Sequence, residues 1–191
     1  MHAVILHGGT CKDVGIEAIH SQLCEILQTA AWTTTTYRLE EMVIHPCVGC
    51  FSCWLRTPGE CHFADEGRTI TRAFIQSDLR IYLTPISFGG YSGLLKTAID
   101  RMIPNISPLF EKVNGEMHHC LRYPNVMKFL VVGWQQQANA GSAEIFSQLI
   151  RRNAINMHAP NSACTVLTAA HSAEEQGMLL NGLLGNLEEG R

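Results

Sequence analysis

The sequence contains few charged residues and no strongly basic or acidic segment. Charged residues make up 16% of its 191 positions, and the formal net charge at pH 7 is −3. Because nucleic-acid-binding surfaces are basic, this composition argues against nucleic acid as a partner. The apolar runs are only as long as strands, so we expect no membrane-spanning helix. A strand follows Met1-His2-Ala3 directly, which leaves no room for a signal peptide, and we therefore expect a cytoplasmic protein.

Length and cysteine content narrow the class of protein further. A chain of this length is expected to form a single domain, residues 1–191, with a proper hydrophobic core. Eight cysteines are many for a chain without a secretion signal, and four of them lie between Cys47 and Cys61. Such clustering favours metal or redox chemistry over a disulfide scaffold.

Strand-like and helix-like segments alternate five times along the chain. Short apolar or β-branched runs predict strands at 3–6, 32–37, 81–84, 127–132 and 164–167. Helical periodicity predicts helices at 12–29, 65–76, 92–102, 142–153 and 173–187. This alternation predicts an α/β fold, a doubly wound parallel sheet with helices on both faces. The segment 105–125 is expected to be irregular, with His118 and His119 exposed in a loop near a subunit contact.

The segment 80–101 combines a strand, a glycine loop and the start of a helix. Pro85 ends the strand because proline has no N–H to give to the ladder. Gly89 and Gly90 allow positive φ and close approach of a ligand. Ser92 is a suitable N-cap for the helix that follows. Open α/β sheets bind ligands in such a crevice, at the carboxyl end of a strand.

Within this segment, TPISFGGYSGLLKTAIDR resembles the flavin-ring loop of flavodoxin-like NAD(P)H-dependent FMN reductases. The residues that fit the family's pattern are Thr84, Pro85, Gly89, Ser92, Leu95, Lys96, Ile99, Asp100 and Arg101. The resemblance implies a flavodoxin-like sheet of order 2-1-3-4-5, FMN as cofactor, NAD(P)H as reductant and a small-molecule or protein electron acceptor. It also implies a homodimer or homotetramer, because the flavin of relatives lies near a dimer interface.

Three loops at strand ends are candidate cofactor-binding segments. The family holds the FMN phosphate on the first helix N-terminus, where this chain has GGTCKD in place of the usual G-S-x-R. Asp13 would oppose a phosphate there unless it turns away to cap the helix. Trp134 could stack on a flavin or nicotinamide ring, or could be a core-edge tryptophan. The candidates are Gly9, Thr10, Lys12, Pro85, Ile86, Ser87, Phe88, Gly89, Gly90, Tyr91, Gly133 and Trp134.

The segment 45–62, HPCVGCFSCWLRTPGECH, is expected to be a loop with cysteines spaced C-x2-C-x2-C-x7-C. Thiolates this close can surround one centre. The pattern resembles iron–sulfur flavoproteins, a branch of the same fold family in which a compact cysteine motif holds a [4Fe–4S] cluster. The resemblance assigns Cys47, Cys50, Cys53 and Cys61 as ligands. Two alternatives stay open: a zinc site made from these cysteines, with or without His45 or His62, and a metal-free segment that forms a wall of the flavin pocket.

The sequence therefore predicts an FMN-dependent oxidoreductase. Because the flavin itself carries out the redox chemistry, we assign no catalytic acid or base. The altered first loop supports a second hypothesis from another class of protein. In that hypothesis the chain is a flavodoxin-like scaffold that has lost its cofactor and acts as a binding or regulatory protein.

Overall fold

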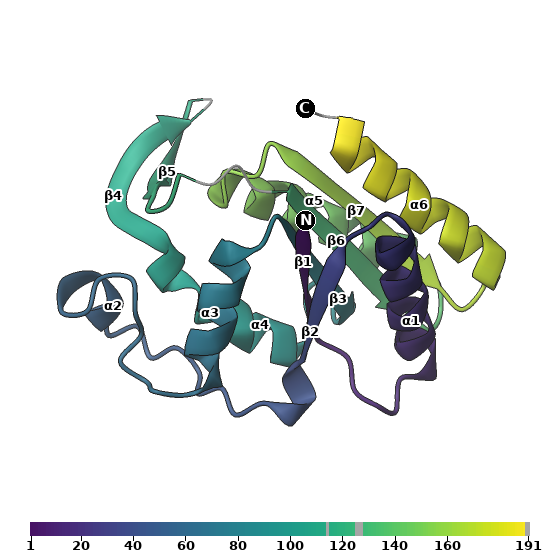
Figure 1. Cartoon of the computed structure of the whole chain (residues 1–191), viewed down its shortest axis with the longest axis horizontal. Coiled ribbons are helices and arrows are strands. Elements are labelled where there is room, and N and C mark those ends of the chain that lie inside the picture. Colours follow the sequence, from purple (N-terminus) through teal and green to yellow (C-terminus); the bar gives the residue numbers. More distant parts are fainter. Residues whose placement is uncertain (114, 125–127, 190–191) are drawn as a thin grey trace.

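A five-stranded parallel sheet forms the centre of the computed structural model, which describes residues 1–113, 115–124 and 128–189 (Figure 1). Its strands are β1 (His2–His7), β2 (Thr33–Arg38), β3 (Leu79–Pro85), β6 (Lys128–Gln135) and β7 (Asn161–Thr168). Their order across the sheet is β2-β1-β3-β6-β7. Counted among these five strands alone, the order is 2-1-3-4-5, so the predicted flavodoxin-like sheet is confirmed.

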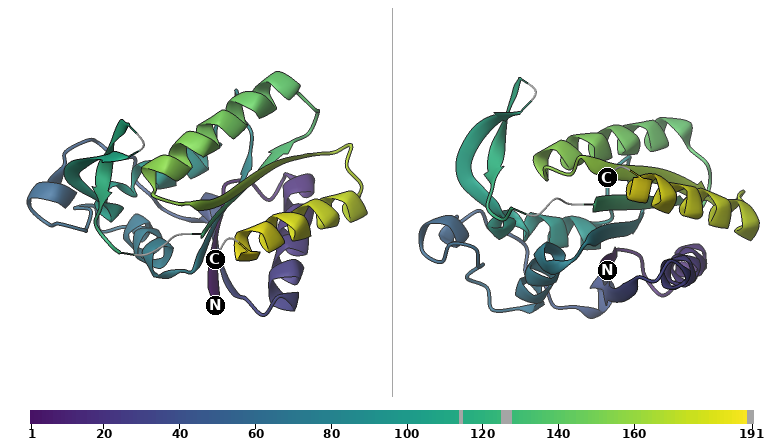
Figure 2. Two further views of the ribbon diagram at one scale, coloured as in Figure 1. Left: turned by 90° about the horizontal axis from the view of Figure 1, so that it is seen from above. Right: turned by 45° about the horizontal axis from the view of Figure 1, so that its top comes forward.

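Helices cover both faces of the sheet, as Figure 2 shows. The main helices are α1 (Val14–Thr29), α3 (Glu66–Gln76), α4 (Gly93–Asp100), α5 (Ala140–Asn156) and α6 (Ala173–Glu189). Three shorter helices are α2 (Ser52–Leu55), η1 (Leu39–Glu41) and η2 (Ile103–Asn105). One apolar core lies between the sheet and α1 with α6, and a second lies between the sheet and α3, α4 and α5.

The first strand explains why the sequence shows a continuous apolar run. Ala3 and Ile5 face the core under α1 and α6, whereas Val4 and Leu6 face the opposite core. Successive side chains of a strand point to opposite faces, so a strand buried on both faces needs apolar residues at every position. The predicted strand at 3–6 is therefore correct, and the structure extends it to His7.

The segment between η2 and β6 differs from the prediction. Instead of irregular chain, β4 (Ile106–Val113) and β5 (Glu116–Leu121) form a two-stranded antiparallel sheet that extends away from the parallel one (Figure 2). His118 on β5 is buried, with its Nδ1 2.8 Å from Asn156 Oδ1 and its Nε2 3.1 Å from Glu116 Oε2. The prediction of two exposed loop histidines was therefore wrong: both lie on β5, where His118 is buried and His119 is half-buried.

Strand β6 is also longer than the sequence predicted. Gly133 and Trp134 pair with Thr84 and Pro85 of β3, so they belong to the strand and not to the loop after it. A Cβ atom at position 133 would lie 2.8 Å from both Ile86 and Phe146, which makes this glycine a packing requirement. Met127, the predicted first residue of this strand, lies outside the described residues.

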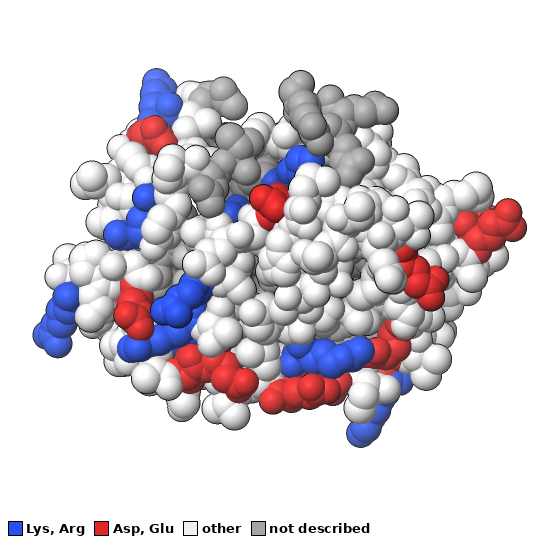
Figure 3. Space-filling model, in the orientation of Figure 1, with Lys and Arg blue, Asp and Glu red and all other residues white. Residues whose placement is uncertain are grey.

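Two surface features bear on the predicted partners. Within the described ranges, no helix is long and apolar enough to cross a membrane. On the face that Figure 3 shows, basic and acidic side chains alternate along the surface without forming one basic stripe. The prediction that nucleic acid is not a partner stays a prediction.

Candidate functional site

Hydrogen bonds join the loop after β1 to the loop after β3. Ser92 Oγ donates to Gly8 O at 2.6 Å and accepts from Leu95 N at 3.2 Å, so the predicted N-cap of α4 is confirmed. Thr84 Oγ1 accepts from Ser92 N at 3.1 Å, and Gly8 N donates to Leu83 O at 2.8 Å. Two of the predicted cofactor-binding loops therefore lie side by side at the carboxyl ends of neighbouring strands, the usual ligand position in this kind of sheet.

The loop after β3 closes in a tight turn. Ser87 and Gly90 exchange backbone hydrogen bonds of 3.0 and 2.8 Å, and the two residues between them, Phe88 and Gly89, both have positive φ. Positive φ is costly for an aromatic residue and free for glycine. The Phe88 side chain is fully exposed at the tip, while a Cβ on Gly89 would lie 2.7 Å from Ile145 of α5.

The loop after β1 does not have the arrangement that the sequence predicted. Asp13 precedes α1 but makes no side-chain capping bond to it. Instead, Asp13 Oδ2 accepts from both the backbone N and the Oγ1 of Thr10, each at 3.2 Å. Asp13 therefore does not turn away to cap the helix, which was the condition under which its carboxylate would not oppose an FMN phosphate at this loop.

Three other predicted cofactor residues face the interior. Trp134 is 6% exposed and packs in the core against Gly15 of α1, which supports the core alternative for this tryptophan. Tyr91 is buried, and its hydroxyl accepts a hydrogen bond from Asn153 Nδ2 at 2.7 Å. Gly133 is covered by Ile86 and Phe146. Gly9 and Gly89 are buried as well, whereas the loop residues Thr10, Lys12, 86–88 and Gly90 retain some exposure at the sheet edge.

A buried polar group that the sequence analysis missed lies beneath α1. His7 is fully buried, with Nε2 3.3 Å from Glu17 Oε1, and Glu17 forms a two-point ion pair with Arg38 at 2.6 and 2.8 Å. His20 meets the His7 ring edge-on at 5.3 Å between centroids. Burial lowers the pKa of both histidines. The sequence does contain a signal for this buried group, because His7 directly follows the apolar run of the first strand.

These histidines predict acid sensitivity. Because the fold favours their neutral forms, the unfolded chain takes up protons first as the pH falls below about 6.5. Their contribution to stability is therefore complete above that pH and declines below it, by up to about 1.4 kcal/mol per pH unit for each histidine. Urea denaturation between pH 7 and pH 5 measures this decline in the free energy of unfolding. His7→Gln should flatten the decline, and an unchanged pH dependence would contradict the prediction.

The four cysteines of the 45–62 segment line one small pocket. Cys47, Cys50, Cys53 and Cys61 surround it together with Phe51, Phe63 and Ile103. All four thiols are free of disulfide bonds. Burial raises the pKa of Cys53, and the neighbouring thiolates, Cys61 foremost, raise it further. Hydrogen bonding to Ser52 lowers the pKa of Cys50, whose Sγ is 3.4 Å from His62 Nδ1.

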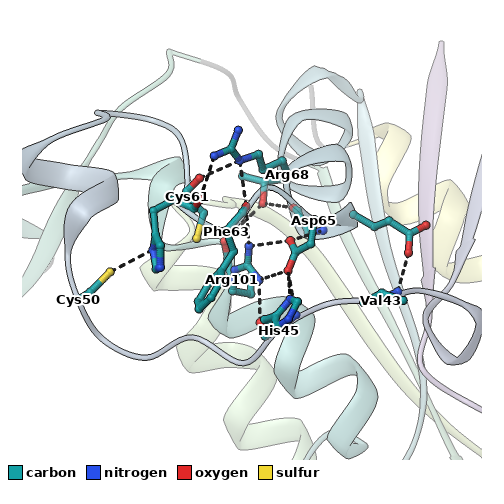
Figure 4. Close-up of polar contacts among 12 residues, drawn as sticks. Val43, His45, Cys50, Cys61, Phe63, Asp65, Arg68 and Arg101 are labelled. Carbon is teal, nitrogen blue, oxygen red and sulfur yellow. Dashed lines mark hydrogen bonds and ion pairs between the residues drawn. The ribbon is translucent and has the colours of Figure 1, made fainter.

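Two arginines hold this loop in place (Figure 4). Arg101 forms two bonds of 2.8 Å to Asp65 and donates to His45 O at 2.7 Å. Although burial raises the pKa of Asp65, hydrogen bonds from Arg101 and His45 hold it well below the usual range. Arg68 Nε donates to Cys61 O at 2.8 Å and to Phe63 O at 2.9 Å. Both ends of the cysteine segment are thus fixed to α3 and to the residue after α4.

The geometry of the pocket selects neither of the possible metal centres. Within 1–113, 115–124 and 128–189, no three His, Cys, Asp or Glu side chains are arranged to hold a metal. The cysteine pocket itself has a volume of about 20 Å³, which is room for about one water molecule. A four-iron cluster is larger than a single ion and is bound by cysteines placed around a cavity, one to each iron. The four-cysteine pocket has the donor set that such a cluster requires.

Comparison with known proteins identifies the family. A sequence model described as NADPH-dependent FMN reductase matches residues 1–162. The chain therefore belongs to the NADPH-dependent FMN reductase family. An iron–sulfur flavoprotein of Methanocaldococcus jannaschii is 33% identical over 66 residues, which are 35% of this chain and 33% of that protein. The match thus spans about a third of that relative.

Solved structures share the fold at low sequence identity. The NAD(P)H:quinone oxidoreductase of Methanothermobacter marburgensis has a TM-score of 0.69 and 11% identity, over 95% of this chain and 96% of that one. An FMN-dependent NADH-azoreductase of Bacillus anthracis, solved with FMN, has a TM-score of 0.62 and 11% identity, over 99% and 97% of the two chains. These likenesses support the fold alone.

Proposed function

We propose that this protein is an FMN-dependent oxidoreductase that takes electrons from NAD(P)H and passes them through a [4Fe–4S] cluster on Cys47, Cys50, Cys53 and Cys61. The observation that carries the proposal is the pocket that all four cysteines line. The local similarity to an iron–sulfur flavoprotein supports the same reading. The electron acceptor would be a small molecule or a protein.

The turn at 87–90 is suited to hold the flavin ring. Ser87 and Gly90 bond to each other, which leaves the N–H groups of Phe88 and Gly89 without a hydrogen bond inside the described part of the chain. The backbone donor of Phe88 lies at an exposed tip and can bond to the polar edge of an isoalloxazine, whereas Gly89 is buried against Ile145. When bound, FMN supplies the hydride and electron chemistry, and the protein supplies orientation and electrostatics.

Exposed apolar side chains support a homodimer or homotetramer. Phe88 is fully exposed at the turn, and the β4–β5 hairpin exposes Leu109, Phe110 and Met117. Grouped apolar side chains on a hairpin are typical of protein–protein contacts. We propose that a second copy of the chain covers part of this surface.

The first loop provides the test of FMN binding. Asp13→Asn should tighten FMN binding about tenfold, because it removes a carboxylate that repels the phosphate by about 1.4 kcal/mol at roughly 6 Å in water. Flavin fluorescence titration of apo protein measures the affinity. Riboflavin lacks the phosphate and is the matched control, since its affinity should not change. Equal effects on both flavins would place the phosphate away from Thr10.

The contact between Asp13 and Thr10 also favours the second candidate function, a scaffold without a cofactor. In that case neither the native chain nor Asp13→Asn binds FMN under conditions that saturate a known flavodoxin. If the native chain binds flavin and oxidises NAD(P)H, the protein is an oxidoreductase and the scaffold hypothesis is wrong.

A further inference from the structure

An apolar cavity of about 210 Å³ lies outside the candidate flavin loops, and one of its lining residues, Asn153, donates a hydrogen bond to the hydroxyl of Tyr91 in the loop after β3. Its walls come from the ends of α3, α4 and α5 and from the base of the β4–β5 hairpin, which Figure 1 labels, and also from η2. Arg80, at the start of β3, also lines it, whereas the flavin loop begins where β3 ends. Five strand residues separate the two positions by about 17 Å.

Arg80 is an unusual residue for such a cavity. It is 1% exposed, and within the described residues it forms no ion pair with a carboxylate. Its Nε donates to Phe74 O and its Nη2 donates to Ile75 O at 3.1 Å. Its Nη1 is buried and has no hydrogen-bond partner. Burial lowers the pKa of Arg80, and the Asp78 carboxylate raises it without forming an ion pair with the guanidinium. A buried cation without an ion-pair partner is costly, so an anion bound in the cavity would stabilise it.

The other lining residues narrow the chemistry of that anion. The cavity has no acidic lining residue, and Ile99, Met102, Ile106 and Leu121 make its walls apolar. Asn156 accepts from His118 through Oδ1, which leaves its Nδ2 to donate. A single cation among apolar walls suits one negative charge on an apolar body. Phosphate, with nearly two charges, would require further cations.

We propose that this cavity binds a small monocarboxylic acid with an aromatic or short aliphatic body, whose carboxylate pairs with the Arg80 guanidinium. The volume is appropriate, because a cavity of about 150 Å³ already holds benzene. Ligand sites of this type are apolar pockets with a few fixed polar groups. The site is separate from the flavin crevice.

Capping of α3 accounts for part of the role of Arg80, since Phe74 and Ile75 end that helix. Two carbonyl bonds satisfy Nε and Nη2, but they neither neutralise the charge nor satisfy Nη1. Capping also does not account for the cavity next to the guanidinium. The proposal therefore rests on the cavity and on the free nitrogen together.

Calorimetric titration of the purified full chain with phenylacetate tests the proposal. Phenylacetamide is the neutral control of the same shape. We expect the acid to bind at least tenfold more tightly than the amide, since hydrogen bonds to charged groups have about that effect. Saturating FMN should leave the affinity unchanged, whereas competition with FMN would place the acid in the flavin crevice and overturn the proposal.

Three variants locate the binding. Arg80→Met should weaken phenylacetate binding at least tenfold, and Leu121→Trp should do the same by filling the cavity from a partly exposed position without touching Arg80. Arg151→Met, which removes a largely exposed arginine of α5, should have no effect. If Arg80→Met fails to fold, Leu121→Trp decides. Equal affinity for acid and amide, native affinity in Leu121→Trp, or no binding at all would overturn the proposal.

Discussion

Arg101→Met is expected to lower the free energy of unfolding by about 3–5 kcal/mol, the usual cost of removing one partner of a buried ion pair. The Arg101 and Asp65 side chains are 1% and 7% exposed and share two bonds of 2.8 Å. Methionine fills a similar volume but leaves the Asp65 carboxylate buried without a counter-charge. It also removes the donor to His45 O. Urea denaturation at pH 7 measures the loss.

The pH dependence separates this cause from a simple packing defect. In the native chain the pKa of Asp65 lies well below its unfolded value of about 4, so its contribution is complete above that pH and declines as the pH falls. Without Arg101 the buried carboxyl favours protonation, and the difference between variant and native chain should shrink in acid. The exposed pair of Lys96 and Asp100 is the control, and Lys96→Met should cost no more than about 0.5 kcal/mol. A loss that is independent of pH would contradict the ion-pair explanation.

The alternation of apolar and periodic segments was sufficient to predict the parallel sheet. The strands β1, β3 and β6 are almost wholly buried, so continuous apolar runs mark them in the sequence, and β-branched residues mark β2. The order of the strands came from the family resemblance, because periodicity contains no information about which strands are neighbours. Four successive threonines form β2 at the edge of the sheet, where an apolar face is not required throughout.

The β4–β5 hairpin could not be predicted in the same way. Most side chains of β4 are exposed, so the strand lacks the apolar alternation of a buried one. Its stability depends instead on contacts with residues distant in sequence, such as His118 with Asn156 and Glu116 with Arg152. Contacts of this kind leave no local signal.

The candidate site likewise contains some features that have a local sequence signal and others that do not. The turn at Gly89 and the cap at Ser92 follow from local chemistry, and the sequence predicted both. The bond from Thr10 to Asp13 was not predicted, because a helix-capping pattern and a loop contact use the same residue types at the same spacing. The anchors of the cysteine loop were missed as well, since Arg68 and Arg101 follow that loop in the sequence and approach it only in the folded chain.

Cys50→Ser is expected to remove the iron from the protein completely and to leave FMN bound. If the pocket holds a [4Fe–4S] cluster, native protein made and purified without oxygen should contain about four irons and four sulfides per chain. Four thiolates around one pocket repel one another unless a metal centre neutralises them or they stay protonated. Burial is the main cause of the raised pKa of Cys53, and repulsion by the neighbouring thiolates adds to it. The flavin loops follow β1 and β3 and contain none of these cysteines, so flavin content should not change.

Two controls define how the iron is held. Cys164→Ser changes a cysteine on β7, outside the pocket, and should leave the iron content at the native value. Arg101→Met keeps all four cysteine ligands but removes the bonds from Arg101 to Asp65 and to His45 O. The cysteine loop is then less firmly held, so the iron should be lost more rapidly on exposure to air. Iron and sulfide analysis, with the broad visible absorbance of the cluster, measures both. An anaerobic preparation that contains flavin, is fully active and has no iron would show that the four cysteines form only a wall of reduced thiols.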